Sequence, residues 1–439
     1  MNRRTFLGAS AGLALLPTMS RAARQSPANK LNVALIGVYG RGLAFYHPLS
    51  EENVVALCDV DERRFPEALK HFPQARTYVD WRRCLDHPGL DAVVICTTDH
   101  THAFIANWAL NRNLHVYCEK PLTITVEEAR VVRANWLPKK GRIATQVGTQ
   151  LHANPNYNRI REMIHDGAIG TLEAARAWGN RQIRRAGNLP AEGSPPAGLH
   201  FDLWLGPAPD RPFNPGYFSG VAGANCLNWN MFWDFGAGQV GDMGSHTMDL
   251  LWSAVDATLP TSAEARGEAY NPEVTPVELE CHFEHPANDW RGPITTSWYQ
   301  GGLMPESPRP FLDLKKIDHG VMFEGTQGFL VADFGSRILQ PLTDRSDMTY
   351  YRPRPKEAVI PSIGDFVKQW LDACRDPQRK TACDFEYHGN MIEQLLLGLV
   401  AYRAGRKISY DGATGRVTDN PEADGLLRRT YRRGWTLNG

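Results

Sequence analysis

Short, nearly uninterrupted apolar runs alternate with stretches of helical periodicity over the first third of the chain. The first run, residues 31–36, is followed by a glycine-rich turn and by a helical stretch that begins at Arg41. Continuous apolar strands that alternate with helices are typical of a parallel sheet covered on both faces. Further strands are predicted at residues 54–59, 91–96, 114–118 and 143–147, and helices at 62–71, 102–111 and 125–135. We therefore predict a doubly wound parallel sheet over residues 30–150.

The pattern changes after a predicted linking helix at residues 154–166. From residues 171–178 onward the strands alternate polar and apolar positions, which is typical of a mixed or antiparallel sheet. Further strands are predicted at 277–285, 294–300 and 321–333, and helices at 363–373 and 389–404. Residues 182–223 form a long irregular segment rich in proline, glycine and aromatic residues, and such segments are more often functional than idle. Residues 151–439 are therefore predicted to form a second domain.

Composition narrows the classes of partner. The 439 residues carry 48 Lys and Arg against 48 Asp and Glu, so the formal net charge is zero. Dedicated nucleic-acid binders usually carry an excess of cations, so no nucleic-acid partner is expected. No apolar run reaches the roughly 18 residues that a membrane-spanning helix requires, so no membrane span is expected. The eight cysteines form no C-x-x-C pair, which leaves a zinc ribbon or a redox dithiol without support.

The turn after the first strand, GVYGRG, resembles a dinucleotide-binding turn. Gly37 and Gly42 fit the first and third positions of the fingerprint G-x-G-x-x-G, whereas Tyr39 occupies the second. Gly40, one residue later, is expected to take over the close approach to the pyrophosphate. Backbone N–H groups at the start of the following helix can then bind the anion. The alternative is a glycine turn that binds no nucleotide.

A carboxylate at the end of the second strand favours NAD over NADP. Asp59 stands about 20 residues after Gly37, where an acidic side chain can accept both ribose hydroxyls and repels a 2′-phosphate. Arg41, Arg63 and Arg64 lie close enough in sequence to leave NADP open.

Two later strands run into the motifs TTDHTH and CEKPL. Ligands of such sheets bind at the carboxyl ends of the strands. Thr97, Thr98, Asp99 and His102 are therefore predicted to line the cofactor. No metal is predicted, because no further carboxylate or histidine cluster has metal-ligand spacing. Lys120, directly past its strand, is expected to point towards the nicotinamide; an EKP motif on its own would indicate only a surface lysine.

The segment around GDMGSHTMD carries the candidate chemistry. Asp242 and His246 are four residues apart, so on a helix they share one face. Oxidation of an alcohol needs a base for the hydroxyl proton, and histidine has a suitable pKa. Asp242 can orient the imidazole, and Lys120 can stabilise charge on the reacting oxygen. A helix-start carboxylate with a buried core histidine is the alternative. Trp229 and Trp233 are candidates to stack on a sugar face, with core packing as their alternative.

Together these motifs resemble the glucose–fructose oxidoreductase/inositol dehydrogenase (Gfo/Idh/MocA) family. The matching segments are LIGVYGRG, CDVD (58–61), TTDHTHA (97–103), EKPL (119–122), QVGTQ (146–150), GAIGTL (167–172) and GDMGSHTMD (241–249). The resemblance extends from Lys30 to the C-terminus. It implies an N-terminal Rossmann domain and a C-terminal α/β domain with a large open, mostly antiparallel sheet, which commonly serves as an oligomer interface. It also implies bound NAD(P) and a small sugar or polyol substrate.

The resemblance also implies roles for individual residues of this chain. It implies catalytic roles for Lys120, Asp242 and His246. The cofactor-binding residues that we predict are Gly37, Tyr39, Gly40, Arg41, Gly42, Asp59, Thr97, Thr98, Asp99, His102, Glu119, Lys120 and Gln146. We also expect a homo-oligomer.

Residues 1–29 have the parts of an export signal. Arg3 and Arg4 precede Phe6 and Leu7, a short block rich in Gly, Ala and Leu follows, and small residues surround position 21. This order predicts a twin-arginine signal peptide and hence a periplasmic or otherwise exported protein. The alternative is a disordered tail with a chance arginine pair. Because a periplasm has no ready pool of free dinucleotide, an exported enzyme is expected to bind its cofactor tightly and to regenerate it in place.

Three functional hypotheses follow. The first is an exported NAD(P)-dependent oxidoreductase that acts on a hydroxyl of a sugar, polyol or glycoside. The second is a redox-neutral, NAD-dependent glycosidase or epimerase of the same family. For the glycosidase branch we expect a tyrosine-bearing loop before the histidine, whereas VGDMGSH carries Asp242, which favours the dehydrogenase. The third is a non-catalytic sugar or nucleotide binder that retained the fold.

Overall fold

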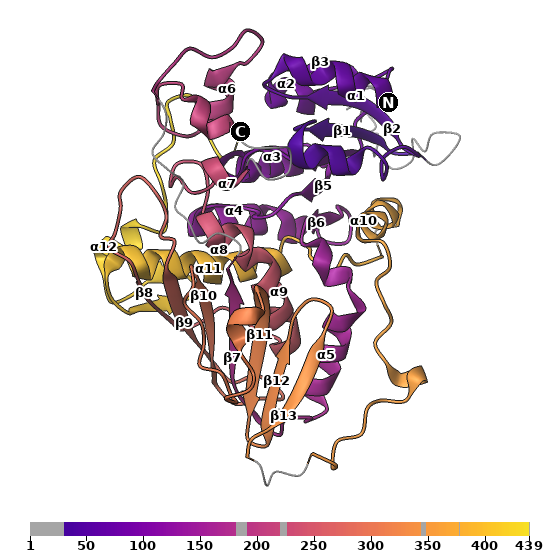
Figure 1. The fold of residues 1–439 in the computed structure, drawn as a ribbon. Coiled ribbons are helices and arrows are strands. Elements are labelled where there is room, and N and C mark those ends of the chain that lie inside the picture. The colour runs from indigo at the N-terminus through magenta and orange to yellow at the C-terminus, as the bar shows by residue number, and fades with distance from the viewer. Residues whose placement is uncertain (1–29, 181–190, 220–225, 344–347, 377, 439) are drawn as a thin grey trace, which may run out of the picture.

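The computed structural model describes residues 30–180, 191–219, 226–343, 348–376 and 378–438. They form two α/β units, with a smaller sheet in the N-terminal unit and a larger sheet below it (Figure 1). No helix within these ranges combines the length and the apolar character needed to cross a bilayer. The predicted export signal, residues 1–29, lies outside the described residues. Residues 181–190 and 220–225, which overlap the two ends of the predicted irregular segment, lie outside them as well.

Within the described ranges, six parallel strands form the first sheet, in the order β3-β2-β1-β4-β5-β6. The strands are β1 (Asn32–Ile36), β2 (Asn53–Cys58), β3 (Arg76–Tyr78), β4 (Ala92–Ile95), β5 (His115–Cys118) and β6 (Thr145–Val147). The predicted doubly wound sheet is confirmed, although the sequence pattern missed β3, a short edge strand. The strand order reverses between β1 and β4, so the loops after these two strands diverge and leave room for a ligand.

Alternate residues of each strand enter two hydrophobic clusters, one on each face of this sheet. In β1, Ala34 and Ile36 belong to one cluster, and Val33 and Leu35 belong to the other. One cluster includes residues of α2 (Trp81–Leu85), α3 (Asp99–Asn111) and α4 (Val126–Trp136). The other includes residues of η1 (Gly40–Phe45), α1 (Phe65–His71) and α10 (Phe366–Arg375). Burial on both faces explains why these strands are continuous apolar runs in the sequence.

Local side-chain hydrogen bonds define where the helices begin. At the start of α4, Thr125 accepts a hydrogen bond from the N–H of Glu128, and Glu128 accepts one from the N–H of Ile124, both at 3.2 Å. The first bond satisfies a backbone donor that the first helical turn leaves open, and the second fixes the residue before the N-cap. The helix predicted from Arg41 is instead the short 3₁₀ helix η1.

The second sheet is mostly antiparallel, as predicted. Among the described residues its order is β13-β12-β11-β7-β10-β9-β8-β14-β15, and only the pair β7 and β10 is parallel. The strands are β7 (Leu172–Gly179), β8 (Ser262–Gly267), β9 (Leu279–His285), β10 (Ile294–Gln300), β11 (His319–Gly325), β12 (Gly328–Ala332), β13 (Arg337–Pro341), β14 (Ile408–Asp411) and β15 (Arg416–Val417). The single segment predicted at 321–333 is therefore two strands joined by a turn.

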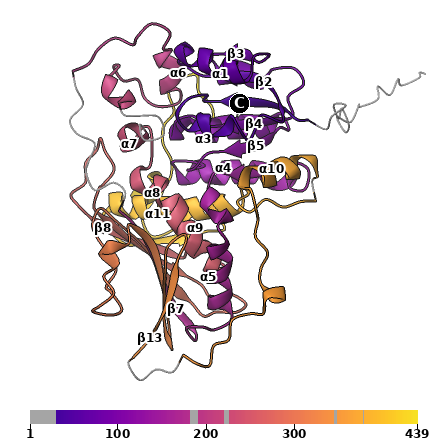
Figure 2. The same cartoon turned by 45° about the vertical axis from the view of Figure 1, so that its right-hand side comes forward.

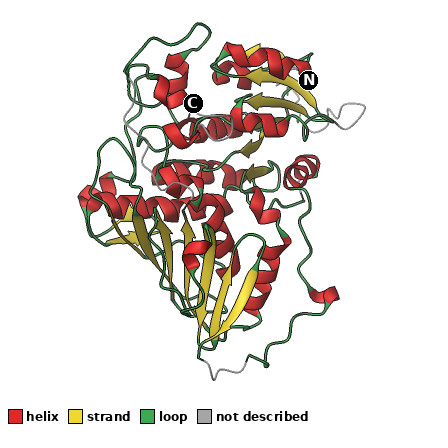
Figure 3. Ribbon diagram, in the orientation of Figure 1, coloured by secondary structure: helices red, strands yellow, loops and turns green. Residues whose placement is uncertain are grey.

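Helices lie against one face of this large sheet, as Figures 2 and 3 show. They are α5 (Pro155–His165), α9 (Gly244–Val255) and α11 (Tyr387–Ala404), and their apolar residues share one core with those of the strands. On the opposite face a smaller cluster includes Trp178 and Tyr299, together with Leu314 from the loop after β10. Both sides of the sheet are therefore partly covered within one chain.

The end of the chain returns to the first unit. Phe366 and Trp370 of α10 pack with Tyr117 of β5. Further on, Trp108 and Asn107 of α3 donate side-chain hydrogen bonds to backbone carbonyls of the last ten residues, at 3.0 and 2.9 Å. The domain boundary predicted between residues 150 and 151 stays a prediction. In the folded chain, both ends of residues 151–439 pack against the first unit.

Candidate active site

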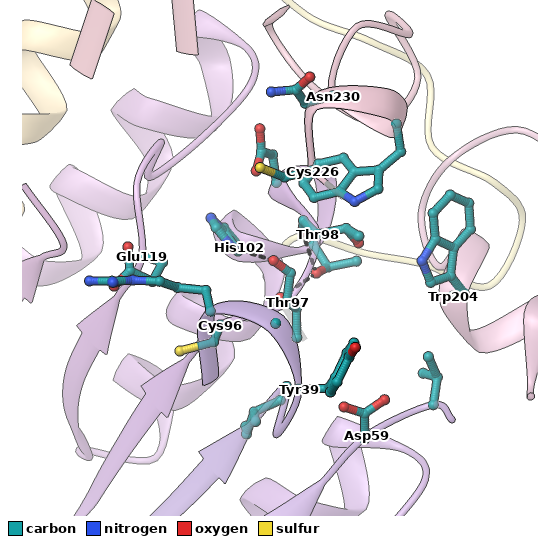
Figure 4. Close-up of a pocket in the computed structure, with 18 of the residues that line it drawn as sticks. Tyr39, Asp59, Cys96, Thr97, Thr98, His102, Glu119, Trp204, Cys226 and Asn230 are labelled. Carbon is teal, nitrogen blue, oxygen red and sulfur yellow. Dashed lines mark hydrogen bonds and ion pairs between the residues drawn. The ribbon is translucent and has the colours of Figure 1, made fainter. Parts of the chain in front are cut away.

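A cavity of about 370 Å³ opens at the carboxyl ends of β1 and β4 and extends to α8 (Gly238–Asp242) and α9 of the second unit. Open doubly wound sheets bind ligands at this position, and the size suits a small-molecule site. Figure 4 shows Tyr39, Asp59 and Thr97 from the first unit and Trp204 and Asn230 from the second around one space. Both units therefore build the site.

The glycine turn is shaped for the close approach of a ligand. Gly37 has a φ of +85°, and a Cβ on it would lie 2.5 Å from the carbonyl oxygen of Cys96. A Cβ on Gly42 would lie 2.0 Å from the carbonyl oxygen of Gly37, so glycine at position 42 allows the turn to fold back on itself. Gly42 does not line the cavity. Gly40, with a φ of +63°, lines the cavity as predicted. Only glycine fits the positions of Gly37 and Gly42 without strain, and Gly37 and Gly40 line the cavity at the end of β1, where the sequence predicts the pyrophosphate.

The backbone holds Asp59 at the cavity wall. Its Oδ2 accepts a hydrogen bond from the N–H of Val38, and its Oδ1 accepts one from the N–H of Asp61, both at 3.0 Å. Burial raises the pKa of Asp59 to about 6. The neighbouring Asp61 carboxylate pairs with Arg63 at 2.6 Å and with Arg64 at 2.9 Å. Arg63 and Arg64, which left NADP open in the sequence, both pair with Asp61 in the structure, and the cavity wall presents the Asp59 carboxylate.

His102 ties together the loops after β4 and β5. Its Nδ1 lies 2.7 Å from the carbonyl oxygen of Pro121, and its Nε2 lies 3.0 Å from that of Thr97. Burial lowers the pKa of His102 to about 4. Both ring nitrogens thus lie against backbone carbonyl groups, and the side chain also lines the cavity, as predicted. Thr97, Thr98 and Asp99 line the cavity beside it, as predicted.

Glu119 fastens the glycine turn to the end of β5. Its buried carboxylate accepts a hydrogen bond from Nε of Arg41 at 2.8 Å. Gly148 leaves the space that this carboxylate fills, since a Cβ there would lie 2.5 Å from Oε2 of Glu119. Tyr39 packs beneath Arg64, whose guanidinium carbon is 3.8 Å from the ring centre. The predicted residues Tyr39, Arg41 and Glu119 therefore all line the cavity.

Lys120 is predicted from one motif, and Asp242 with His246 from another, and the structure brings the three side chains together in the cavity. The ammonium group of Lys120, past β5, forms an ion pair with the Asp242 carboxylate at the end of α8. Gly241 permits this approach, because a Cβ there would lie 3.1 Å from the side chain of Pro121. Burial opposes the charge on Lys120, but the Asp242 carboxylate raises the pKa of Lys120 above its ordinary value. The ammonium group therefore stays charged at neutral pH.

His246 lies in the first turn of α9 and is buried. Met243 separates α8 from α9, so the predicted spacing of Asp242 and His246 spans a break between two short helices rather than one continuous helix. The Tyr157 hydroxyl of α5 donates a hydrogen bond to the carbonyl of His246 at 3.1 Å. This contact holds the turn that carries the imidazole.

Besides Gly42, which was predicted to bind the cofactor and does not line the cavity, two further sequence-based assignments are corrected. Gln146 is buried outside the cavity lining, and its amide donates to the carbonyl of Phe366 at 2.7 Å, so it anchors α10 rather than a cofactor. The Trp233 indole donates to the carbonyl of Asn271 at 2.9 Å and packs against the core of the second unit. Trp229, by contrast, lines the cavity. Closeness to His246 in sequence could not show which of the two tryptophans lines the cavity, because the chain turns between them.

Several lining residues were missed by the sequence analysis. They come mainly from the second unit and include Gln150, Leu199, Leu203, Trp204, Phe218, Cys226 and Asn230. Asn230 is only 3% exposed, and its side-chain oxygen has no hydrogen-bond partner within the described part of the chain. Its backbone carbonyl accepts a hydrogen bond from the N–H of Gly238 at 2.8 Å, which fixes its place. Adjacency to Trp229 was the only signal in the sequence.

A buried ion pair between His152 and Asp249 links α9 to a neighbouring segment. Among the residues that the structure describes, His152, Asp249 and Cys383 bring potential ligand atoms within 4.8 Å of one another. Nδ1 of His152 lies 2.9 Å from Oδ1 of Asp249, which also accepts a hydrogen bond from the Tyr387 hydroxyl at 2.7 Å. Burial lowers the pKa of His152, but the Asp249 carboxylate raises it well above the ordinary value. A charged histidine thus links η4 (Gln150–Ala153) to the helix that carries His246.

Two family models match this fold and site. Residues 31–149 match the NAD-binding Rossmann-fold domain of the Gfo/Idh/MocA oxidoreductase family, and residues 177–278 match its C-terminal alpha/beta domain. The chain belongs to the Gfo/Idh/MocA family. The family model describes an NAD-binding domain, and the glycine turn and Asp59 of that domain line the cavity.

Curated relatives of this Gfo/Idh/MocA chain have named activities. Inositol 2-dehydrogenase from Salmonella typhimurium is 33% identical over 147 residues, which are 32% of this chain and 43% of the relative. Levoglucosan dehydrogenase from Pseudarthrobacter phenanthrenivorans is 26% identical over 250 residues, 53% of this chain and 54% of the relative. A glycosyl hydrolase family 109 protein from Stenotrophomonas maltophilia is 28% identical over 202 residues, 42% and 43% of the two chains. The matches thus span about half the length of these relatives.

Solved structures of the family share the fold. Levoglucosan dehydrogenase in complex with NADH and levoglucosan has a TM-score of 0.58 at 16% identity, and the match covers 87% of this chain and 99% of that one. The WlbA dehydrogenase from Bordetella pertussis, in complex with NADH and UDP-GlcNAcA, has a TM-score of 0.60 at 14% identity, with 87% and 99% covered.

The ion pair in the cavity predicts a stability pattern. Lys120→Met leaves the Asp242 carboxylate buried without its cation, so the free energy of unfolding should fall by about 3 kcal/mol. The double variant Lys120→Met/Asp242→Asn removes that charge and should recover much of the loss. Urea unfolding of the wild type, both single variants and the double variant measures the coupling. Additive losses would contradict an energetic link between the two side chains.

Proposed function

We propose that this protein oxidises a hydroxyl-bearing carbon of a small sugar, polyol or glycoside with NAD as the hydride acceptor. The observation that carries the proposal is that Lys120, Asp242 and His246 share one cavity with the glycine turn and Asp59. The relatives support the substrate class, since they are named inositol and levoglucosan dehydrogenases.

Each of the three side chains has a distinct role in this proposal. His246 takes the proton of the substrate hydroxyl, because a buried imidazole can act as a base near neutral pH. Lys120 donates a hydrogen bond to the reacting oxygen, and its charge is balanced by Asp242. NAD, when bound, supplies the nicotinamide carbon that receives the hydride. Asp242 and His246 are buried, which limits the access of bulk water to the reacting atoms.

Asn230 and Trp229 are the proposed sugar contacts. The side-chain oxygen of Asn230 makes no hydrogen bond within the described residues, and the side chain lines the cavity. A buried amide oxygen without a partner is unfavourable, and a sugar hydroxyl can donate a hydrogen bond to it. Trp229 lines the same wall and offers an apolar ring face to a pyranose or cyclitol.

A redox-neutral glycosidase is the second candidate, because a glycosyl hydrolase family 109 protein is among the relatives. In that cycle the sugar would be oxidised, the aglycone eliminated, water added and the sugar reduced again, with no net change in the redox state of a bound NAD. The same base and the same cavity can serve both reactions. Incubation with nitrophenyl glycosides separates them, since a glycosidase releases nitrophenol without net NADH, and a dehydrogenase accumulates NADH without nitrophenol.

We also propose that the protein is exported, recycles its cofactor and self-associates. The arginine pair at Arg3 and Arg4, with the apolar block after it, supports twin-arginine export. An exported enzyme then requires NAD that stays bound and is regenerated in place. Fractionation of cells that express the full chain, with and without Arg3→Lys/Arg4→Lys, tests export. Assembly into a homo-oligomer is proposed from the family resemblance, in which the large sheet commonly serves as the interface, and light scattering on the purified protein tests it.

Removal of the imidazole should abolish the chemistry without emptying the cofactor site. His246→Ala is expected to lower kcat for sugar-dependent NADH formation by about 10²–10⁴-fold, because the proton acceptor is lost. Bound NAD, measured after denaturation, should be unchanged. His282→Ala, in β9 and outside the cavity lining, is the matched control and should keep full activity. Loss of NAD from the His246 variant would contradict its assigned role.

Loss of the Asn230 amide should weaken substrate binding. Asn230→Ala is expected to raise KM for the best sugar about tenfold, since hydrogen bonds to a substrate hydroxyl contribute on the order of 1 kcal/mol or more. Asn228→Ala, whose amide bonds to the Ser219 carbonyl at 2.6 Å outside the cavity lining, is the control. Steady-state kinetics decide the matter, and an unchanged KM in Asn230→Ala would remove this residue from the substrate site.

A further inference from the structure

We propose that residues 198–218 of the second unit, here named the strap, form the outer wall of the adenosine subsite and control the release of NAD. The inference rests on the NAD site proposed above and concerns its adenosine end. The site of the sugar chemistry, at Lys120 and His246, lies at the other part of the cavity and is not involved.

The strap is hydrogen-bonded directly to the loop that carries Asp59. The N–H of Glu62 donates to the carbonyl of Gly198, and the N–H of His200 donates to the carbonyl of Val60, both at 2.8 Å. Between these bonds, Asp61 and Leu199 form an antiparallel bridge. Leu199 is therefore placed next to the loop where the ribose of a dinucleotide is expected, although the two segments are far apart in sequence.

Side chains of the strap face those of the first unit across the cavity. Leu199, Leu203, Trp204 and Phe218 line it on the strap side, and Val79 and Trp81 line it on the side of the first sheet. Figure 4 shows Trp204 across the space from Tyr39 and Asp59. An apolar slot with a carboxylate at one end matches adenosine, which has a flat aromatic base and a ribose with two hydroxyls.

The end of the chain holds the strap in place. Arg432 donates from Nε to the carbonyl of Gly206 at 2.9 Å and pairs with Asp202 at 2.6 Å and with Asp210 at 2.9 Å. Its side chain is only 10% exposed. Asp202 belongs to α6 (Phe201–Leu205), which lies within the strap, and Gly206 follows this helix directly. Nε2 of His100, from α3, lies 3.0 Å from the carbonyl of Trp204.

This anchoring predicts slow release of the cofactor. The strap is attached to the Asp59 loop on one side, to α3 beneath, and to the C-terminal residues on the other side. A dinucleotide that leaves past it has to break several of these contacts together. Retention of NAD between turnovers is what an exported enzyme with an internally recycled cofactor requires.

Two ligands that each carry one half of NAD test the proposal. Calorimetry measures the binding of ADP-ribose, which contains the adenosine, and of nicotinamide mononucleotide, which does not. Leu199→Ser removes apolar cover, and Arg432→Ala removes the anchor. Each is expected to weaken ADP-ribose binding about tenfold, as the loss of one buried apolar contact or anchor would, and to leave nicotinamide mononucleotide binding unchanged. In stopped-flow displacement of bound NADH by excess NAD⁺, the release rate should rise by about the same factor.

Controls separate a local effect from general loosening. Arg428→Ala lies in the same C-terminal region and contacts Asp424 instead of the strap, so it should behave as wild type. Leu199→Met retains an apolar side chain and should restore slow release. Equal weakening of both ligands, or no change in ADP-ribose binding and NADH release, would overturn the proposal. Failure of sugar oxidation alone, with these binding results intact, would instead refute the proposed reaction.

Discussion

The buried ion pair between Lys120 and Asp242 is the constraint on which the site depends. Lys120 follows the last residues of β5, and Asp242 ends α8 of the other unit. A charged group taken out of water is strongly unfavourable unless its partner is close. Each unit therefore supplies the charge that the other needs, and the two can pack only where these groups meet. A Cβ at position 241 would lie 3.1 Å from the side chain of Pro121, so glycine eases the close packing of the two segments that carry the pair.

Sequence patterns predicted the parts of the molecule that obey local or topological rules. The first sheet was readable because burial on both faces makes its strands continuously apolar. The sites after β1, β4 and β5 followed, since parallel strands bring their carboxyl ends to one edge. Lys120, Asp242 and His246 were predicted from motifs, and their convergence is a property of the folded chain.

The rest depended on packing between distant segments, which a local pattern does not contain. Gln146 stands in a segment that matched the family, yet it binds Phe366, more than 200 residues further on. Asn230 and Trp233 are three positions apart, but a tight turn sends one to the cavity and the other to the Asn271 carbonyl. Similarly, nothing in the composition of residues 198–218 indicates that their backbone pairs with the loop after β2.

Retention of the cofactor and the choice of reaction are physically linked. The chemical groups at Lys120, Asp242 and His246 are compatible with oxidation alone or with oxidation followed by reduction. If NADH leaves after each oxidation, the outcome is a dehydrogenase that draws on a cofactor pool. If the strap keeps NADH in place, every oxidation has to be followed by a reduction in the same cavity before the next substrate is oxidised. The reduction then falls either on a second substrate, as in a sugar–sugar oxidoreductase, or on the same sugar after elimination and hydration, as in a glycosidase. The lifetime of bound NADH relative to that of the bound sugar therefore separates the functional alternatives more directly than the identity of the catalytic residues.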